Sequence, residues 1–441
     1  MTRDRRPGAH LMLVLTATMA VGPLLTHSLS AMSPLVIEDL ELTEAQFGLL
    51  ATTTFFVAAV TAVRTGRWAD QLAARTLLVV MFGGAALAML LTAAAPGYTV
   101  LLLAMVLSGL GQVMANPATN RLIRLHVPAG RRASWLGIKQ AGVQASQLVA
   151  GLTFPALGLL LGWRTAVLVA VGAVLLLLVH GWWTVPDNSS GAPAGHPPRA
   201  THRSGVTPPP RTGATPPHRS WAALRSRAAR RSRRAQTPSS RTARAAARPP
   251  MPGVVRAYAA AAALTGLGAQ AANVYLPLYA HRDLDLDVVA AGATVSVSAL
   301  VGIASRVLWA RVMDRPHADG FVLLAGMALG AAASAVLLIL APLHPGLAWA
   351  VWPAAVLHGG AALAVSVVVM SGAMRAVPAE RVGASTGVVT MGLYGGFCAG
   401  PLVLGGLLQL TGSFAVGWAV VLVCYLACAV LAVLVRSRAS R

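Results

Sequence analysis

Long apolar segments separated by short polar ones dominate this chain. Each is close to the roughly 17–25 residues that a helix needs to cross a bilayer. The chain does not show the ten-residue alternation of a membrane barrel. The pattern therefore predicts an all-α membrane protein with twelve transmembrane helices, at residues 11–33, 45–65, 76–95, 99–122, 133–157, 164–184, 254–280, 288–310, 320–341, 346–373, 383–408 and 414–435.

The second half of the chain repeats the first. With a displacement of 244 positions, Asp39-Leu40-Glu41-Leu42 falls on Asp283-Leu284-Asp285-Leu286. With a displacement of 250, Val127-Pro128-Ala129 falls on Val377-Pro378-Ala379. A long internal repeat of apolar segments is typical of a transporter made of two halves around a central path. We therefore expect two pseudo-symmetric six-helix bundles.

The repeat also sets the domain boundaries. We expect one six-helix bundle over residues 1–184 and the other over residues 254–441. Between them, residues 185–253 are rich in arginine and proline and contain a single acid, Asp187. Such a composition predicts a disordered linker, and its charge favours contact with anionic lipid over nucleic acid. A short basic surface helix over residues 221–234 is the alternative for part of it.

Composition and charge support a membrane location. Hydrophobic residues make up 56% of the chain and charged residues 11%, whereas a soluble domain has about 25% charged residues. Seventeen arginines fall in short loops and termini on one predicted side. The other side has only Arg164 and Arg282 together with seven acids. The positive-inside rule then predicts that both termini lie in the cytoplasm. We expect a multi-pass protein of the plasma membrane.

A short motif follows the second apolar segment and recurs after the eighth. It reads Gly66-Arg-Trp-Ala-Asp70 and continues to Arg75, and its repeat image is Ala310-Arg-Val-Met-Asp314-Arg315. With this motif, the duplicated six-plus-six segments and the long central loop, the chain resembles the major facilitator superfamily over nearly its whole length. Gln71, Ala73 and Ala74 replace an arginine, a glycine and an arginine of that family's pattern. The resemblance implies a cytoplasmic gate formed by Gly66, Asp70, Arg75, Arg311, Asp314 and Arg315.

The resemblance also implies an architecture and an activity. In that superfamily, spans one, four, seven and ten line the path, with help from spans two, five, eight and eleven. Secondary active transport by alternating access follows, without catalysis. We expect no cofactor and no metal, a small-molecule substrate and a monomer. A proton and another ion are the two alternatives for the coupling ion.

Polar side chains repeat at helical spacing inside several of these spans. Amides that faced lipid would leave donors unsatisfied, so the stripes are expected to face protein or a wet cavity. Interhelical hydrogen bonding is the alternative role. The candidate substrate-binding residues are His27, Gln112, Asn116, Asn120, Lys139, Gln140, Gln144, Gln147, Gln270 and Asn273.

Lys139 is the only lysine in the chain. It lies seven residues after Arg132, which is about 10 Å along a helix axis at about 1.5 Å per residue. One interpretation is that its side chain extends back to the cytoplasmic surface. The other is that it forms a cation in the cavity that meets an anionic solute. Its repeat image is Val389, so the internal symmetry does not require a charge there.

None of the thirteen acids lies in the middle of a predicted span. A proton-driven exporter of cationic drugs usually needs such a buried carboxylate. The prediction is therefore a secondary active transporter of a small solute, with an anion favoured. A proton-coupled drug antiporter is the first alternative, and a polytopic membrane enzyme or sensor is the second. His27 and His358 are the candidates if protons are coupled.

Overall fold

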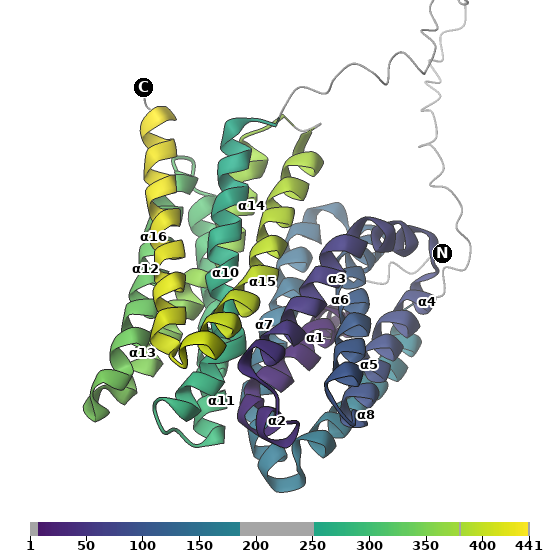
Figure 1. Ribbon diagram of the computed structural model, residues 1–441. Coiled ribbons are helices and arrows are strands. Elements are labelled where there is room, and N and C mark those ends of the chain that lie inside the picture. Colours follow the sequence, from purple (N-terminus) through teal and green to yellow (C-terminus); the bar gives the residue numbers. More distant parts are fainter. Residues whose placement is uncertain (1–7, 186–250, 379–380, 440–441) are drawn as a thin grey trace, which may run out of the picture. The chain divides into compact units, whose positions relative to one another are not determined.

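A computed structural model describes residues 8–185, 251–378 and 381–439, and this part of the chain is helical without a strand (Figure 1). Its contacts group Met1–Gly191 and Pro252–Arg441 into one compact unit. Nearly all of the predicted linker, including the possible basic helix over residues 221–234, lies outside the described residues.

The first half of the chain supplies the helices that precede the linker. A π-helical turn at Val79–Gly83 joins two of them into one continuous span. These helices are α1 (Ala9–Ala31), α2 (Ser33–Asp39), α3 (Glu44–Gln71), α4 (Ala74–Leu78), α5 (Gly84–Ala93), α6 (Tyr98–His126), α7 (Arg132–Leu161) and α8 (Trp163–Thr184).

The second half supplies the helices that follow the linker. Here a π-helical turn at His358–Ala362 interrupts one span. The helices are α10 (Gly253–Arg282), α11 (Val288–Met313), α12 (Gly320–Leu340), α13 (Val351–Leu357), α14 (Val365–Arg375), α15 (Val382–Thr411) and α16 (Phe414–Ala439).

The helices agree with the predicted spans. Eleven described segments are long and apolar enough to cross a membrane. The remaining predicted span, residues 254–280, corresponds to α10, which is 30 residues long but less apolar. It contacts α1, α11, α14, α15 and α16, and most of its side chains are buried. Because α10 faces protein on so many sides, it does not need a fully apolar surface.

The internal repeat is visible in the backbone. Glu41 has φ 49° and Asp285 has φ 53°, and these two are the described non-glycine residues with positive φ. They occupy equivalent positions of the repeated turn, one before α3 and one before α11. Residues other than glycine rarely adopt this conformation. Both halves therefore use the same strained turn to start their second long helix.

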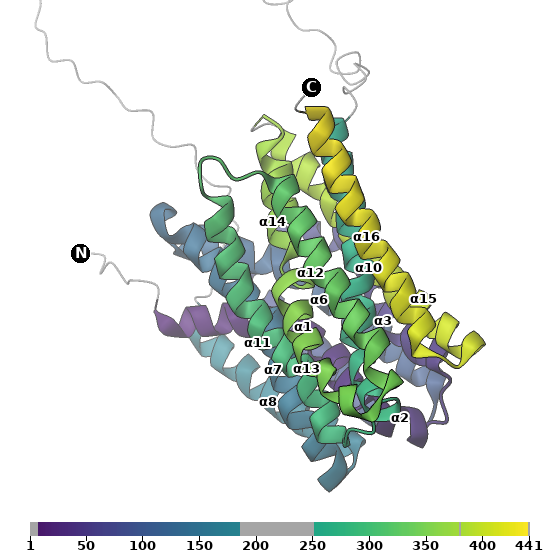
Figure 2. The ribbon, with the colours of Figure 1, turned by 90° about the vertical axis from the view of Figure 1, so that its left-hand side faces the viewer.

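The two halves pack against each other mainly through three pairs of helices. α3 contacts α15, α7 contacts α11, and α1 contacts α10, as the views in Figures 1 and 2 show. Glycine allows close approach in the second pair, because a Cβ atom on Gly292 of α11 would lie 3.0 Å from the backbone oxygen of Gly151 in α7. The Ser296 hydroxyl of α11 donates to the Leu148 oxygen of α7 at 3.0 Å.

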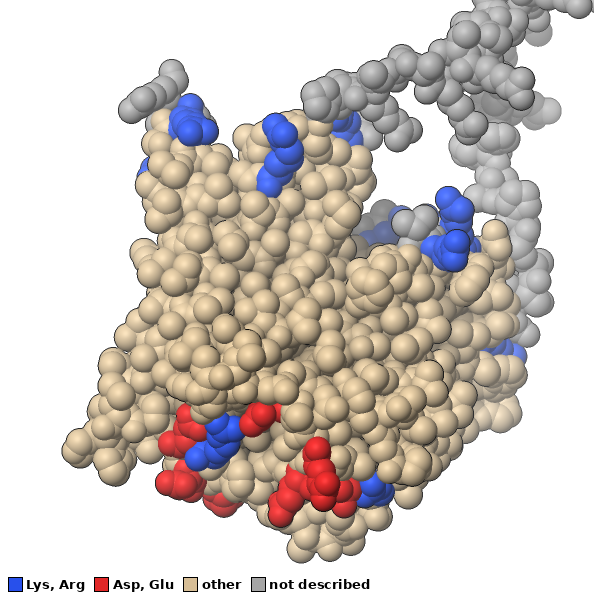
Figure 3. Space-filling model, viewed as in Figure 1, with Lys and Arg blue, Asp and Glu red and all other residues tan. Residues whose placement is uncertain are grey.

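Charged side chains gather at opposite ends of this unit (Figure 3). Arginine side chains gather at the end where α3, α6, α11 and α14 finish, which we call the basic end. Aspartate and glutamate side chains gather at the other end, called the acidic end, around the turns at Asp39 and Asp283. This segregation matches the arginine asymmetry seen in the sequence.

Candidate solute-binding site

Lys139 lies in the first part of α7 with its side chain turned toward α6. Its Nζ atom donates to Thr119 Oγ1 at 2.7 Å and to Asn116 Oδ1 at 3.2 Å. The residue is 0% exposed. The side chain therefore lies inside the bundle and does not extend to the basic surface in this structure. An ammonium has three N–H donors, and the described residues supply two acceptors.

Asn116 links this lysine to the glutamine beside it. Its Oδ1 atom also accepts from Gln140 Nε2 at 3.0 Å. Asn116 and Gln140 are both half-buried, while Asn120, one turn closer to the basic end of α6, is exposed. The predicted stripes on the fourth and fifth spans thus meet at Asn116, and Asn120 extends the α6 stripe toward solvent.

His27 of α1 is buried against α7. Its Nδ1 atom lies 3.0 Å from Ser146 Oγ, and Ser146 Oγ donates to the Val143 oxygen at 2.8 Å. The close approach of these helices depends on Gly142, because a side chain there would meet the backbone oxygen of Thr16. His27 therefore has a local hydrogen-bond partner within the first half.

Asn273 of α10 is the meeting point of polar groups from both halves. Its Oδ1 atom accepts from Gln147 Nε2 of α7 at 3.1 Å and lies 3.2 Å from His358 Nε2. Its Nδ2 atom donates to Gln270 Oε1 at 3.3 Å. Its backbone oxygen accepts from the Ser30 hydroxyl of α1 at 2.6 Å. Four elements thus converge on one asparagine.

Several side-chain amides among the predicted binding residues have atoms that make no hydrogen bond to the described residues. Gln112 Oε1, Gln144 Oε1 and Gln270 Nε2 are buried and have no partner among the described residues. Gln144 faces the second half, because a Cβ atom on Gly302 of α11 would lie 3.5 Å from its Cγ. A buried polar atom without a partner costs about 1–3 kcal/mol. A solute that hydrogen-bonds to these atoms would remove that cost.

Sequence reasoning missed Arg306, which lies within the apolar run of α11. Its Nη2 atom donates to the Leu363 oxygen at 3.0 Å, next to the π-helical turn. Its neighbours Ser305 and Trp309 donate to the oxygens of Gly359 at 3.1 Å and Gly360 at 2.8 Å. The sequence could have pointed to Arg306, because this arginine lies inside a predicted span and so belongs to neither set of loop arginines.

The predicted gate lies at the basic end, where arginines bind the ends of helices. Arg121 Nη1 donates to the Ala69 oxygen at 2.9 Å and also contacts the Leu72 oxygen. In the second half, Arg375 contacts the Met313 oxygen, and its Nη2 atom lies 4.0 Å from Asp314 Oδ1. In each half, an arginine from another span therefore contacts the motif at the equivalent position. The motif alone did not reveal these two arginines.

The other gate candidates have more varied positions. Arg75 Nε donates to the Val185 oxygen at 3.3 Å, and its guanidinium lies 5.2 Å from the centre of the Trp182 ring. Arg311 and Arg315 are exposed. Asp314 ends α11, and Asp319 is the N-cap of α12. The surroundings of Gly66 and the side chain of Asp70 lie outside the described structure.

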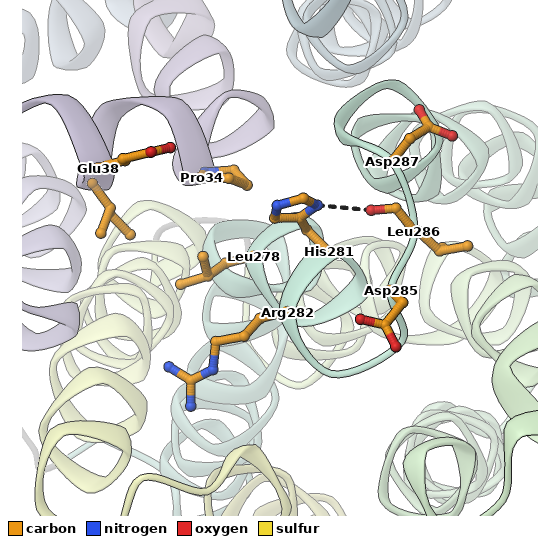
Figure 4. Close-up of a pocket in the computed structure, with 9 residues that line it drawn as sticks. Pro34, Glu38, Leu278, His281, Arg282, Asp285, Leu286 and Asp287 are labelled. Carbon is orange, nitrogen blue, oxygen red and sulfur yellow. Dashed lines mark hydrogen bonds between the residues drawn. The ribbon is translucent and has the colours of Figure 1, made fainter.

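A separate cavity opens at the acidic end (Figure 4). It has a volume of about 590 Å³ and is lined by Pro34 and Glu38 of α2, by His281, and by Asp285 and Asp287, among others. The Nδ1 atom of His281 lies 2.7 Å from the Leu286 oxygen. Nearby, burial raises the pKa of Asp283, and the Arg282 guanidinium opposes that rise. The cavity contains none of the predicted binding residues.

The arrangement suits recognition of a polar solute. Two polar groups lie inside the bundles, one around Asn116 and one around Asn273. The side chains that form them are amides, hydroxyls, imidazoles and one ammonium, all of which bind solutes reversibly. Within the described part of the chain, no three His, Cys, Asp or Glu side chains gather as metal ligands.

Comparison with protein families gives one match that covers most of the chain. The family model described as Major Facilitator Superfamily matches residues 11–401. A comparison with curated proteins gives no match.

Solved structures with the same fold are also found. The nucleoside transporter NupG has a TM-score of 0.67 at 14% identity, covering 97% of this chain and 98% of that one. A bacterial homolog of the human lysosomal transporter Spinster, inward-facing and unoccupied, has a TM-score of 0.66 at 18% identity, covering 98% of this chain and 96% of that one. At these identities the likeness shows the fold alone.

Proposed function

The chain belongs to the Major Facilitator Superfamily, and we propose that it carries a small anionic solute across the membrane by secondary active transport. Its fold is that of transporters, with two bundles that share a polar interior. Lys139, Gln140 and Asn116 would bind the solute from the first half. Gln144, Gln147, Gln270 and Asn273 would bind it near the contact with the second half.

The buried ammonium of Lys139 is the observation that carries the preference for an anion. It is fully buried, and its two partners among the described residues are neutral oxygens. A buried charge without an opposite charge is costly, and ion pairing reduces that cost. An anionic solute would supply the missing charge. A cationic solute would be repelled by it.

The contacts between the halves lie where one state of an alternating-access cycle would have them. The described hydrogen bonds between them include Ser30 with Asn273, Thr52 with the Cys398 oxygen at 2.9 Å, and Tyr275 with the Glu44 oxygen at 2.6 Å. These lie in the middle and toward the acidic end, and the surface is hollowed between the halves at the basic end (Figure 3). We infer a state open to the basic side.

By the positive-inside rule, the basic side would face the cytoplasm. The protein would then lie in the plasma membrane. Both termini would then be cytoplasmic, and the central linker would rest on anionic lipid. The bundles would occupy residues 1–184 and 254–441 of a monomer. Tags at residue 215 and in the loop at Asp285 test this topology, because both tags on one side would contradict it.

A proton-coupled drug antiporter has less support. In the described membrane-spanning helices, the carboxylates lie near helix ends, as Glu44 does at the start of α3. A carboxylate in the middle of a span, which could exchange a proton for a cation, is not found among these residues. If protons are coupled to an anion instead, His27 and His358 are histidines that lie in the polar interior and could carry the proton.

Flux into proteoliposomes tests the proposal. The purified protein is reconstituted and supplied in turn with labelled organic anions, neutral metabolites and cationic drugs, under proton, sodium or solute gradients. We expect counterflow of one or more anions, and none of the cations. Flux of cations alone would favour the drug antiporter, and absence of flux under every gradient would favour an enzyme or a sensor.

A further inference from the structure

Arg306 places a second cation within a membrane-spanning helix, in the half opposite to Lys139, and its side chain is half-buried. It belongs to α11, and its guanidinium turns toward the interrupted span where α13 and α14 are joined. The Leu363 oxygen, just after that π-helical turn, accepts its hydrogen bond at 3.0 Å. Charged residues inside membrane spans are rare and usually mark a path for a solute or an ion.

The contacts of Arg306 use only part of its capacity. A guanidinium has five N–H donors, and Nη2 makes the described hydrogen bond. Its Nε atom is buried and has no partner among the described residues. Ser305 and Trp309 already occupy the neighbouring oxygens of Gly359 and Gly360. The interrupted helix therefore does not need all of the donors that Arg306 provides.

Among the residues that the structure describes, Arg306 has no carboxylate partner. The described ion pairs of arginine involve Arg164, Arg282, Arg375 and Arg436, and each of these lies at one end of the bundles. Arg306, which is half-buried, and Lys139, which is fully buried, are thus two cations within spans that have no opposing charge among the described residues. In a low-dielectric interior, such charges favour an anionic ligand strongly.

Helix packing puts the two cations at a similar depth. α7 and α11 run antiparallel, with Ser296 bonded to Leu148 and Gly302 beside Gln144. Arg306 follows Gly302 by four residues, which is about 6 Å at about 1.5 Å per residue. Lys139 precedes Gln144 by five residues, which is about 7.5 Å toward the same basic end. Their levels differ by only about 2 Å.

We infer that Arg306 is a second anion-binding residue, so that the transported solute has two anionic groups, one for each half of the protein. This inference rests on the proposed function and narrows it to short dicarboxylates. One carboxylate binds Lys139 of the first half, and the other binds the free face of the Arg306 guanidinium. A solute that bridges the halves in this way stabilises the conformation in which Lys139 and Arg306 both lie close to it.

The competing role for Arg306 is structural. Its guanidinium could serve only to satisfy the Leu363 oxygen next to the π-helical turn. A glutamine at this position can still donate to that oxygen, but it has no charge. Arg306→Gln therefore separates the two roles, and Arg306→Lys keeps the charge as a second variant. Arg256→Gln is the matched control, because Arg256 is exposed in the first turn of α10.

The experiment measures thermal melting of the full-length protein with dicarboxylates from malonate to suberate, each compared with its own monoamide. The monoamide keeps the length and hydrogen-bonding atoms but has one charge fewer. In the wild type we expect at least one diacid to bind about 30-fold or more tightly than its monoamide. In Arg306→Gln the two should bind alike, and in Arg256→Gln the preference should persist.

Two results would overturn the inference. In the first, the wild type binds no diacid more tightly than the matching monoamide. This result does not depend on the folding of any variant. The second is an Arg306→Gln protein that keeps the full preference. Monocarboxylate binding that depends on Lys139 but not on Arg306 would leave the proposed function standing and remove this inference. Failure of every anion to bind, in the wild type and in Lys139→Gln alike, would remove both.

Discussion

Nη1 of Arg282 in α10 lies 2.8 Å from Oε1 of Glu44 in α3, so an ion pair joins the two halves at their acidic end. Nη2 of the same arginine donates to the Gly412 oxygen at 2.9 Å. The Arg282 side chain is 37% exposed, so the pair contributes no more than about 1 kcal/mol. It can nevertheless bias an equilibrium between two states of similar energy.

Glu44→Gln should therefore weaken closure of the acidic end with little effect on folding. We expect a shift of about fivefold or less toward the state that is open at this end, because about 1 kcal/mol corresponds to that ratio. Thiol labelling of a single cysteine placed beside Pro34 measures it. High salt should produce the same shift in the wild type and a smaller one in the variant. Equal labelling of the two proteins at all salt concentrations would contradict a gating role.

Glycine packing makes a second prediction about the same closure. A side chain at Gly48 of α3 would meet the Tyr275 hydroxyl and the Pro401 backbone oxygen, both in the other half. Backbone cannot yield as a flexible side chain does, so Gly48→Ala should cost the closed acidic end about 1–3 kcal/mol. Gly395→Ala is the control, because no atom lies within 4 Å of the added methyl group. Labelling at the acidic end should rise in the first variant and stay unchanged in the second.

Asn273 should couple the two halves energetically. Its Oδ1 atom accepts from Gln147 Nε2, and the bond exists only while the halves are in contact. A double-mutant cycle with Gln147→Ala and Asn273→Ala should give a coupling energy of about 0.6 kcal/mol, a typical value for polar contacts between membrane helices. Thermal unfolding of the four proteins measures it. Gln112→Ala paired with Asn273→Ala should give no coupling, since no described contact joins those two side chains.

Much of the fold could be predicted because it depends on local and periodic signals. The apolar segments gave the helices, and the displaced match of Asp39-Leu40-Glu41-Leu42 gave the two halves. The positive φ angles of Glu41 and Asp285 confirm that this match is structural. The repeat could also show which helices are equivalent. It contains no information on how far one half has rotated against the other.

The site could be predicted only in part, because its contacts depend on packing between distant helices. Spacing placed Gln140, Gln144 and Gln147 on one side of a helix. It could not show that Gln147 meets Asn273, or that the Lys139 ammonium reaches Thr119. Those pairs depend on the rotation of α7 against α6 and α10. Arg306 was missed although it lies inside the predicted span 288–310, because the polar stripes that indicated the site lie in other spans.

Lys139 provides the sharpest test of the proposed function, because stability and transport should change in opposite directions. Its ammonium is buried with Thr119 and Asn116 as neutral partners, and replacement of a buried charge by an apolar side chain of similar size is often neutral or stabilising. Lys139→Met should therefore melt at the same temperature as the wild type or a higher one. If the ammonium binds the solute, the same variant should lose at least about tenfold in transport rate, since about 1.4 kcal/mol corresponds to that factor.

Three further variants complete the Lys139 test. Lys139→Arg keeps the charge but changes its shape and reach, so it should transport at a reduced rate. Gln140→Ala should raise the half-saturating concentration by removing a hydrogen bond to the solute. Arg256→Ala, at an exposed position, should change neither property. A Lys139→Met protein that transports an anion at the wild-type rate would show that this lysine does not bind the solute, whatever its effect on melting.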